Sequence, residues 1–504
     1  MTRSNEEIGR GLAPAREARA IAPGERIHVV GAAGAGASAA ALLAAHAGAQ
    51  ATGCDPGAPS PYTLAIEALG LSVATAHDPA HVATGGVVRV DRLAVTKALT
   101  AIAPDHPELA AAHERGIPTE PWQQVVADVA QTRRSRLTGI TGTHGKSTSA
   151  GWLLHVLATA GRDPSGAVGA LLPAADAGDV PATARWGEGT EFVVEADEYA
   201  GNFDPYHPSV AGLLNAEWDH PDVFADDAAV RAALEGWIRA MRPGPDGARP
   251  TLVANVGDPG AAAVVDGLAD WSGRVVTVAL EAGGAGHDSE IVGRLDATGH
   301  GQDRLIVTGL SGGPVEVVSL LPGRHNAANA LVVAALADAL GVPVGDIAAG
   351  LASFPGVGRR LELKGEPGGV AVIDDYGHHP TAIAANIAAL RARYGDRRLW
   401  AVYEPLTFHR TAAMLGAFAD ALAAADRVAV ADIWAGRDPD TSIVSAAKLA
   451  AATAARGTPA NAPGSVEATA AWLATEVKPG DVVLVMGGGR SYVVAERLVA
   501  LLGG

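Results

Sequence analysis

Cysteine, positive charge and long apolar runs are all scarce in this chain of 504 residues. Its single cysteine, Cys54, excludes a disulfide framework and a zinc site built from cysteines, and indicates a reduced core residue. Lysine and arginine number 38 against 55 aspartates and glutamates, for a net charge of -17, which argues against a nucleic-acid partner. Glycines interrupt the longest apolar stretch, 29–45, so we expect no membrane span.

The N-terminus lacks the positive charge that a secretory leader requires. Glu6, Glu7 and Glu17 all lie within residues 1–24. We therefore expect residues 1–24 to form a mobile polar extension. A reduced cysteine and the absence of a leader favour a cytoplasmic location.

Length and pattern favour an α/β protein of three domains. At about 150 residues per domain the length predicts three, and 48% apolar residues suffice for several cores. Strand-like runs alternate with alanine-rich helical segments, which is typical of mainly parallel sheets. A charged join at 132–136 and a turn-rich segment at 354–358 predict domains at 25–134, 135–355 and 356–504.

The same pattern predicts individual elements. Helices are expected from residue 38, over 147–160 and 325–340, and from residues 380 and 411. Strands are expected at 27–31, 137–141, 192–196, 210–215, 251–255, 275–280, 370–374, 398–404, 427–433 and 481–486.

A glycine-rich loop that contains Ser38 follows the first expected strand. Gly34, Gly36 and Ala39 fit the G-x-G-x-x-G/A pattern, in which backbone N–H groups at a helix start bind a diphosphate. Asp55 ends the next strand, where an acidic side chain usually binds a ribose hydroxyl. The pattern leaves NAD, FAD and a UDP-sugar open as ligands, and a packing turn of small residues is the alternative.

A second loop, between an expected strand and helix, has the composition of a nucleotide triphosphate site. Its backbone N–H groups would surround the phosphates, Lys146 would add charge, and Ser147 would ligate Mg²⁺. The spacing departs from the strict G-x-x-x-x-G-K-[ST] pattern, but no lysine lies between Ser147 and Leu363, which argues against a chance surface lysine at 146. The residues of the predicted ATP site are Gly142, Thr143, His144, Gly145, Lys146, Ser147 and Thr148.

Acidic and polar side chains follow the later strands. Glu195 and His220 end strands at the sheet edge that carries the second loop, so both could reach metal ions on ATP phosphates. Asn326 and Asn329 share a helix face, with helix capping by Asn326 as the alternative. Arg360 lies in the expected hinge, from which domain closure could bring it onto a transferring phosphoryl group.

In this order the motifs resemble the Mur ligase family. The specific parts are Gly142-Thr-His-Gly-Lys and Asp374-Asp-Tyr-Gly-His-His-Pro, and the resemblance runs from about residue 26 to the C-terminus. It implies a Rossmann-like N-terminal domain for a UDP-sugar, a P-loop ATPase-type central domain with a mainly parallel sheet, and a Rossmann-like C-terminal domain. It also implies a ligase of peptidoglycan precursor synthesis that uses ATP and Mg²⁺ to join L-alanine to UDP-N-acetylmuramate through an acyl phosphate.

The resemblance further implies roles for single residues. Lys146 would contact the ATP phosphates, Arg360 the γ-phosphate and Asp375 the ribose side. Ser147, Glu195 and His220 would serve the metal ions, and Asn326 and Asn329 the nucleotide. Substrate would be bound by Gly34, Gly36, Ser38, Asp55, His144, His378 and Arg410.

Several residues depart from the usual family pattern, among them Ala33, Ala37, Tyr199, Glu404 and Leu406. At Tyr199 and Glu404 the sequence resembles a related ligase that attaches a recycled L-Ala–D-Glu–diaminopimelate tripeptide. That activity is therefore an alternative. A non-catalytic UDP-sugar- or ATP-binding protein is another, and the first loop alone would also fit a dehydrogenase. Other family members use a carbamylated lysine in the central domain, and its absence here favours the alanine-adding branch.

Overall fold

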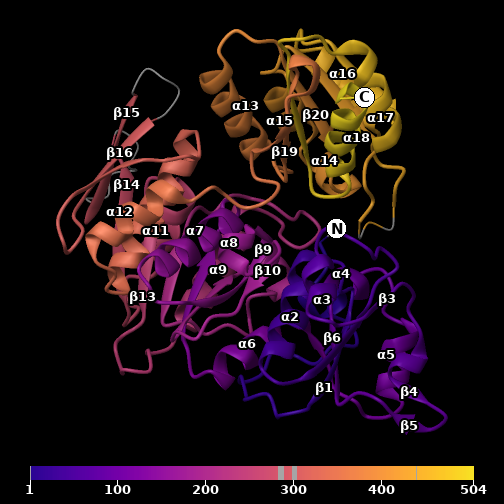
Figure 1. Cartoon of the computed structure of the whole chain (residues 1–504), viewed down its shortest axis with the longest axis vertical. Helices are drawn as coiled ribbons and strands as arrows, with labels where there is room; N and C mark the ends of the chain where they lie inside the picture. The colour runs from indigo at the N-terminus through magenta and orange to yellow at the C-terminus, as the bar shows by residue number, and fades with distance from the viewer. Residues whose placement is uncertain (1, 282–288, 298–302, 437, 439, 504) are drawn as a thin grey trace.

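The computed structural model describes residues 2–281, 289–297, 303–436, 438 and 440–503, and it contains the three expected α/β domains (Figure 1). The N-terminal and central domains lie side by side, with the C-terminal domain above both in that view. Among the described residues, no helix combines the length and the apolar character needed to cross a membrane.

The N-terminal domain is built on a parallel sheet in the order β3-β2-β1-β6-β7. Ile27, Val29 and Val30 of the first strand are fully buried, as expected for a parallel strand covered on both faces. Its strands are β1 (Arg26–Val30), β2 (Gln50–Cys54), β3 (Val73–Ala74), β6 (Arg92–Val95) and β7 (Thr119–Pro121), with a hairpin of β4 (Ala83–Thr84) and β5 (Val87–Val88). Its helices are α1 (Asn5–Ile8), α2 (Ala35–His46), α3 (Leu64–Ala68), η1 (Pro79–His81), α4 (Lys97–Thr100), α5 (Pro107–His113) and α6 (Trp122–Thr132).

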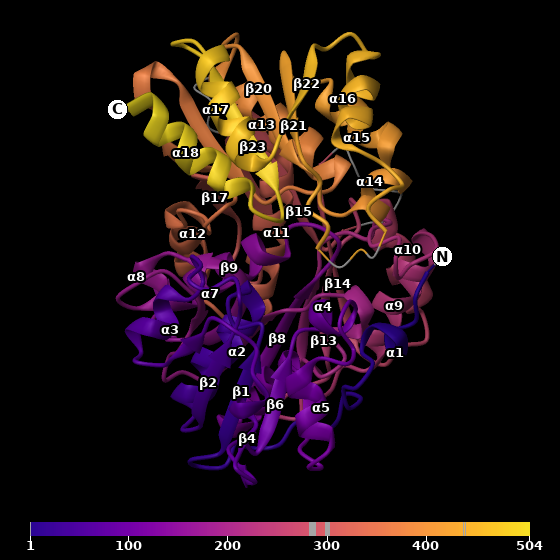
Figure 2. The same cartoon turned by 90° about the vertical axis from the view of Figure 1, so that its right-hand side faces the viewer.

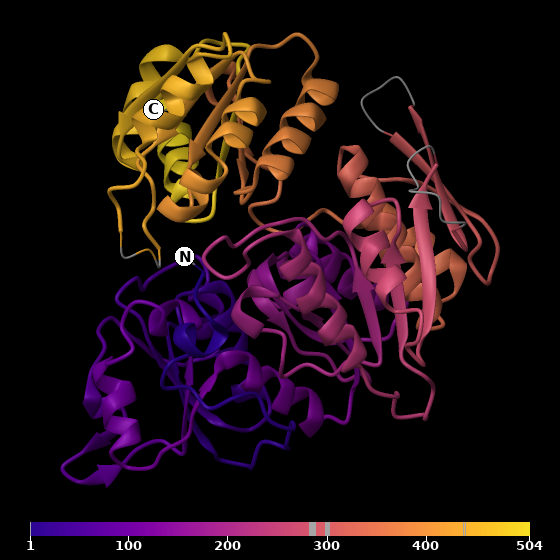
Figure 3. The same ribbon diagram turned by 180° about the vertical axis from the view of Figure 1, so that it is seen from behind.

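The central domain has a mixed sheet in the order β10-β9-β11-β8-β12-β13-β14-β15-β16-β17 within the described residues. The strands from β9 to β15 pair in parallel, whereas β10, β16 and β17 are antiparallel to their neighbours. The strands are β8 (Arg136–Thr141), β9 (Ser165–Leu172), β10 (Ala182–Arg185), β11 (Glu191–Glu195), β12 (Val210–Leu213), β13 (Thr251–Asn255), β14 (Arg274–Leu280), β15 (Ile291–Ala297), β16 (Asp303–Thr308) and β17 (Val315–Val318). The helices are α7 (Lys146–Thr159), α8 (Ala174–Ala177), η2 (Tyr199–Gly201), α9 (Asp227–Arg239), α10 (Pro259–Gly267), α11 (Arg324–Ala339) and α12 (Val344–Ser353). Figure 3 shows β15 and β16 from behind, at the outer edge of the domain.

The C-terminal domain has the sheet order β18-β19-β23-β20-β21-β22, in which only β18 is antiparallel among the described strands. Separate apolar cores lie on its two faces, and Figure 2 shows α17 and α18 in front of the sheet. The strands are β18 (Glu362–Gly365), β19 (Ala371–Asp375), β20 (Leu399–Glu404), β21 (Arg427–Ala431), β22 (Ala460–Gly464) and β23 (Val482–Gly487). The helices are η3 (Pro367–Gly369), α13 (Pro380–Tyr394), α14 (Phe408–Ala413), α15 (Leu415–Leu422), α16 (Ala446–Ala454), α17 (Val466–Glu476) and α18 (Ser491–Gly503).

All ten strands expected from sequence are confirmed, with ends shifted by a few residues. The helix expected from residue 38 begins instead at Ala35, because Gly34 already has the extended backbone of a helix N-cap. Gly36 therefore lies inside α2, where a Cβ would stand 2.2 Å from the ring of Trp122. The absence of a side chain at Gly36 permits close packing of α2 on α6. At this position the structure therefore fits the alternative interpretation of the loop as a packing turn of small residues. The expected boundaries after residues 134 and 355 fall between elements, and we propose them as the domain boundaries.

Residues 2–24, which the sequence predicts to be part of a mobile extension over residues 1–24, pack against both the N-terminal and the central domain. Ile8 is fully buried and Ile21 is 4% exposed. The Arg16 guanidinium pairs with Glu120 at 2.6 Å and with Asp128 at 2.8 Å, both of which are buried. A buried carboxylate requires such a partner, so the charges of the domain hold the segment in place.

We expect Arg16→Leu to lower the stability of the N-terminal domain by about 1–3 kcal/mol, because Glu120 and Asp128 lose one of the two arginines with which they form ion pairs among the described residues. Thermal unfolding followed by circular dichroism measures the change. Arg10→Leu, at an exposed position of the same segment, is the matched control and should leave the melting temperature unchanged. Equal melting temperatures for Arg16→Leu and wild type would contradict this account.

Candidate active site

A single cleft of about 1160 Å³ is lined by residues of all three domains. The carboxyl ends of the parallel strands β8, β11, β12 and β19 open onto it, which is where α/β sheets usually bind ligands. Predicted site residues among its walls are Gly34, Gly36, Asp55, Thr143, His144, Gly145, Lys146, Ser147, Thr148, Glu195, His220, Asn326, Asn329, Arg360, Asp375, His378 and Arg410.

The loop between β8 and α7 requires glycine at two positions. Gly142 has φ +134°, and a Cβ there would lie 2.9 Å from the Asn215 carbonyl oxygen. Gly145 has φ +82°, and a Cβ there would lie 2.7 Å from the Asn329 side chain. The Asn215 amide accepts from the His144 N–H at 2.8 Å and fixes the loop. The result is the concave start of a helix that an anion can occupy.

Lys146, the first residue of α7, extends toward two acids that follow β11. Its Nζ donates to Glu198 Oε2 at 2.7 Å and lies 3.6 Å from Asp197 Oδ1. Burial lowers the pKa of Lys146, but the carboxylates of Glu198 and Asp197 outweigh burial and raise it above its usual value. The ammonium is therefore charged at every physiological pH and stands ready to pair with phosphate oxygens.

Ser147 connects two of the predicted residues. Its hydroxyl donates to Glu195 Oε1 at 3.0 Å and accepts from the Arg360 guanidinium at 3.0 Å. The second oxygen of Glu195 accepts from the Gly169 N–H at 2.6 Å, which fixes the carboxylate. A hydroxyl and a carboxylate are hard oxygen donors that suit Mg²⁺ beside a phosphate chain.

His220 belongs to a neighbouring group and not to that of Ser147. His220 Nε2 lies 3.8 Å from Glu198 Oε1, and Asp197, Glu198 and His220 offer ligand atoms within 4.8 Å of one another. Arg410, which is 1% exposed, donates from Nε to Asp219 at 2.7 Å and from Nη2 toward His220 at 3.1 Å. Burial raises the pKa of Asp219, but Arg410 foremost among its neighbours holds it well below its usual range.

His378 and Arg410 bring the C-terminal domain to the same acid. His378 Nε2 lies 3.9 Å from Asp219 Oδ2, and its Nδ1 lies 3.0 Å from the Tyr376 carbonyl oxygen. Burial, together with the charge of Arg410, lowers the pKa of His378 well below its usual value. His378 is thus neutral at pH 7, and Arg410 is the cation of this group.

A second bridge between the central and C-terminal domains forms around Glu217. Its carboxylate accepts from Thr381 at 2.6 Å and lies 3.6 Å from His144. The His144 ring packs against His379 with ring centroids 4.4 Å apart. Burial raises the pKa of Glu217, but these partners, His144 first, bring it to about 2. His144 therefore contributes to domain contact from within the glycine loop.

Two asparagines of α11 flank the loop. Asn326 and Asn329 are 6% and 8% exposed, and their side chains lie 3.5 Å apart on one face of the helix, as the spacing predicts. Asn326 also donates to the Pro322 carbonyl at 2.8 Å, so it ties down the segment before the helix.

The adjacent Arg359 and Arg360 differ in their surroundings. Arg359 is buried and pairs with Asp374 at 3.2 Å and with the Gly487 carbonyl at 2.9 Å, so it is part of the C-terminal domain. Arg360 crosses to Ser147 in the central domain. Asp375 accepts from the Leu361 N–H at 2.8 Å and so positions this pair. Of the two arginines, Arg360 is the one directed at the phosphate loop.

The N-terminal loop forms the opposite wall of the cleft. Asp55 accepts from the Ala33 N–H at 3.1 Å and the Gly57 N–H at 2.7 Å, which draws the two loops together. Ser38 does not line the cleft: it is fully buried and lies 2.7 Å from the Thr183 hydroxyl of β10. Its position within α2 turns it toward the central domain, and we assign it to packing between domains.

Sequence reasoning missed Asp197, Glu198 and Glu217 as site residues. Asp197 and Glu198 belong to the acidic motif after β11, and only the structure shows that they, and not Glu195, pair with Lys146. Glu217 lies in the segment after β12, and no spacing rule links it to His379 of the other domain.

Three family models match successive parts of the chain. The Mur ligase family, catalytic domain covers residues 26–134, the Mur ligase middle domain 140–337, and the Mur ligase, glutamate ligase domain 359–489. A UDP-N-acetylmuramate–L-alanine ligase of Acidothermus cellulolyticus is 36% identical over 479 residues, which are 94% of each chain. The chain belongs to the Mur ligase family.

Solved structures share the fold of this Mur ligase. The UDP-N-acetylmuramate–alanine ligase of Thermotoga maritima superposes with a TM-score of 0.75 at 22% identity, covering 94% of this chain and 98% of that one. A murein peptide ligase of Psychrobacter arcticus gives a TM-score of 0.69 at 23% identity, covering 95% and 99%. At this identity the likeness shows the three-domain fold alone.

Glu404, which departs from the usual family pattern, makes the stability of the chain depend on pH. Glu404 ends β20 and is 4% exposed, and its Oε2 is buried without a hydrogen-bond partner among the described residues. Burial raises its pKa to about 7, although backbone N–H groups near Ser491 oppose the shift. The folded chain therefore favours the protonated carboxyl, and stability falls as the pH rises from about 4.5 through 7.

We expect Glu404→Gln to remove this loss, because a neutral amide has nothing to ionise. Its gain over wild type should be near zero at pH 4.5 and reach up to about 3 kcal/mol at pH 8.5. Melting temperatures across this range measure it, with Glu496→Gln on the exposed face of α18 as control. A difference that does not change with pH would contradict the assignment.

Proposed function

We propose that this chain is a UDP-N-acetylmuramate–L-alanine ligase, which uses ATP to form an amide bond in the synthesis of a peptidoglycan precursor. The convergence of Lys146, Ser147, Glu195 and Arg360 on one glycine loop carries the ATP-dependent part of the proposal. The name shared by relatives that match about 95% of the chain supports the substrates. We also propose a cytoplasmic location, which the single free cysteine, Cys54, favours.

The donor sets support a magnesium-bound triphosphate at this loop. Ser147 and Glu195 offer hard oxygen ligands, and Asp197, Glu198 and His220 offer a second group of donors. Histidine is a less usual Mg²⁺ ligand, which makes the oxygens of Asp197 and Glu198 the better candidates there. The ion, when bound, would neutralise charge on the phosphates.

The proposed first step transfers the γ-phosphoryl group to the sugar-borne carboxylate, which gives an acyl phosphate and ADP. Lys146 pairs with the phosphate oxygens, and Arg360 offsets the charge on the transferring group. In the second step the alanine amine attacks the acyl carbon, the amine loses a proton, and inorganic phosphate leaves. Closure of the cleft by the C-terminal domain excludes water, which would otherwise hydrolyse the acyl phosphate.

We assign the two ends of the cleft to the two substrates. The loop of Gly34 and Gly36, held by Asp55, binds the UDP-sugar from the N-terminal side. His378 and Arg410 border the opposite wall, where the amino acid is expected. We propose that Asn326, Asn329 and Asp375 lie on the nucleotide side, with Asp375 acting by holding the Arg360 segment.

Lys146→Met should reduce phosphate release by at least about 100-fold, measured on protein that circular dichroism shows to be folded. The reason is that the ammonium would pair with the phosphates during transfer. Coupled-enzyme detection of phosphate with UDP-N-acetylmuramate, ATP and L-alanine measures the rate. ADP formation at the wild-type rate would refute the assigned role.

Neighbouring arginines offer a matched comparison. Arg360→Ala should lower kcat by about 100-fold or more while the melting temperature stays unchanged. Arg359→Ala should lower the melting temperature by several degrees, because it leaves Asp374 buried without its cation. Steady-state kinetics and thermal unfolding of both variants separate the two roles, and the reverse pattern would contradict them.

A panel of amine donors tests the substrate. L-alanine should support phosphate release with UDP-N-acetylmuramate, with glycine and L-serine weaker. Preference for L-Ala–D-Glu–diaminopimelate would instead identify the tripeptide-recycling ligase, an alternative that Tyr199 and Glu404 motivate. No substrate-dependent phosphate release with any donor would identify a non-catalytic binding protein.

A further inference from the structure

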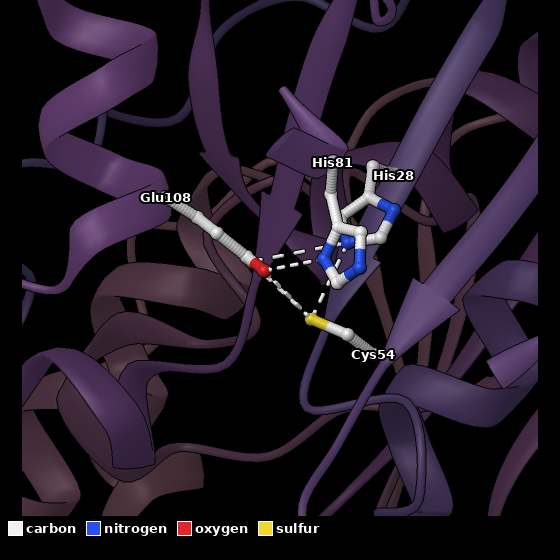
Figure 4. Close-up of side chains that lie close together, drawn as sticks. All are labelled: His28, Cys54, His81 and Glu108. Carbon is white, nitrogen blue, oxygen red and sulfur yellow. Dashed lines mark hydrogen bonds and ion pairs between the residues drawn. The ribbon is translucent and has the colours of Figure 1, made fainter. Parts of the chain in front are cut away.

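A second cluster of chemically reactive side chains lies in the N-terminal domain, away from the cleft. It consists of His28, Cys54, His81 and Glu108, and Figure 4 shows the four side chains pointing toward one another. None of them lines the cleft. They come from β1, the end of β2, η1 and the start of α5, so four separate segments converge on one point.

The spacing of the four ligand atoms is close to that of a tetrahedral metal site. Zn²⁺ with Zn–S of about 2.3 Å and Zn–N of about 2.0–2.1 Å places its ligand atoms roughly 3.3–3.6 Å apart. Here Cys54 Sγ lies 3.3 Å from His28 Nε2 and 3.2 Å from Glu108 Oε2. Glu108 Oε2 also lies 3.8 Å from His28 Nε2, and the other oxygen of the same carboxylate, Oε1, lies 2.7 Å from His81 Nδ1. One ligand atom from each of the four residues lies within 4.8 Å of the others, so small shifts, among them a longer His81–Glu108 distance, let all four face one ion.

Charge also favours a cation at this point. Glu108 is fully buried, and no lysine or arginine of the described residues pairs with it. A buried carboxylate without a cation is costly. A divalent ion bound by one thiolate, one carboxylate and two neutral imidazoles makes a group of zero net charge, which suits a buried position.

The surrounding groups orient the ligands. His28 Nδ1 lies 2.8 Å from the Thr52 hydroxyl, so its Nε2 is directed to the cluster. The Asp78 N–H donates to Glu108 Oε1 at 2.8 Å. Such outer partners are typical of metal ligands. Two further histidines adjoin: His77 lies 3.2 Å from Cys54 Sγ, and its ring meets that of His106, whose two nitrogens are buried without a partner among the described residues.

We propose that His28, Cys54, His81 and Glu108 bind one Zn²⁺ ion. A mixed set of sulfur, nitrogen and oxygen donors suits zinc better than magnesium or calcium. Binding releases the thiol proton of Cys54 to solvent, and the resulting thiolate sulfur coordinates the ion. Four protein ligands leave no open position, so the ion is structural and takes no part in the ligase reaction. His81, 25% exposed in its side chain, gives the ion its path of entry.

The bound ion would stabilise one wall of the cleft through the peptide backbone next to Cys54. Cys54 directly precedes Asp55, whose carboxylate holds the backbone of Ala33 and Gly57. Fixing Cys54 to β1, η1 and α5 therefore fixes the loop in which Asp55 lies.

Zinc content of the full-length chain, purified without a histidine tag or chelator, tests the proposal. Mass spectrometry of the metal should give one zinc per chain, and Co²⁺ added to the stripped protein should produce a thiolate-to-cobalt absorption band. Cys54→Ser and His81→Gln should lower zinc affinity by at least 10-fold, and Cys54→Ser should lose the band. His113→Gln, on the exposed face of α5, is the matched control and should keep one zinc.

Two results would overturn the proposal. One is wild-type protein that takes up neither Zn²⁺ nor Co²⁺, which would make the cluster a metal-free hydrogen-bonded group. The other is a folded Cys54→Ser variant that keeps one tightly bound zinc, which would place the ion elsewhere, such as at His144, Glu217 and His379. If Cys54→Ser fails to fold, the cobalt spectrum of the wild-type protein decides, since it requires the sulfur ligand.

Discussion

The hydroxyl of Ser147 is the point at which the glycine loop, the end of β11 and the C-terminal domain meet. It donates to Glu195 and accepts from Arg360, and each partner is fixed by its own element. The hydroxyl reaches this point because Gly142 and Gly145 adopt backbone angles that place the start of α7 against Asn215 and Asn329. The remaining groups of the site are arranged around this contact.

Much of the architecture could be predicted because parallel strands buried on both faces are continuous apolar runs. Phe192, Val193 and Val194 form such a run and end at Glu195, so both the strand and the position of its acid follow from sequence. The strands β15 to β17, which pair with one another antiparallel at one edge of the central sheet, were not expected. They mix exposed and buried positions, with Val318 38% exposed, and give no comparable signal.

The parts of the site that escaped prediction depend on contacts between distant segments. Lys146 pairs with Glu198 and not with Glu195. Ser38 faces Thr183 and not the cleft, because α2 begins at Ala35 and packs against the central domain. A single cysteine excludes a zinc site built from cysteines, but it does not exclude a site that combines one cysteine with histidine and glutamate. His28, Cys54, His81 and Glu108 lie on four elements, so no local spacing motif links them.

Arg359 and Arg360 are consecutive, yet one is anchored inside the C-terminal domain and the other reaches the central one. Any swing of the C-terminal domain must therefore carry Arg360 with it, since Arg359 and the Asp375 contact to Leu361 leave the pair no independent freedom. With the C-terminal domain turned away from the central domain, a nucleotide bound at the glycine loop would lack the Arg360 guanidinium. If Arg360 acts on the transferring phosphoryl group as proposed, this coupling would limit ATP hydrolysis without product, because the Arg360–Ser147 contact requires the C-terminal domain to lie against the central one.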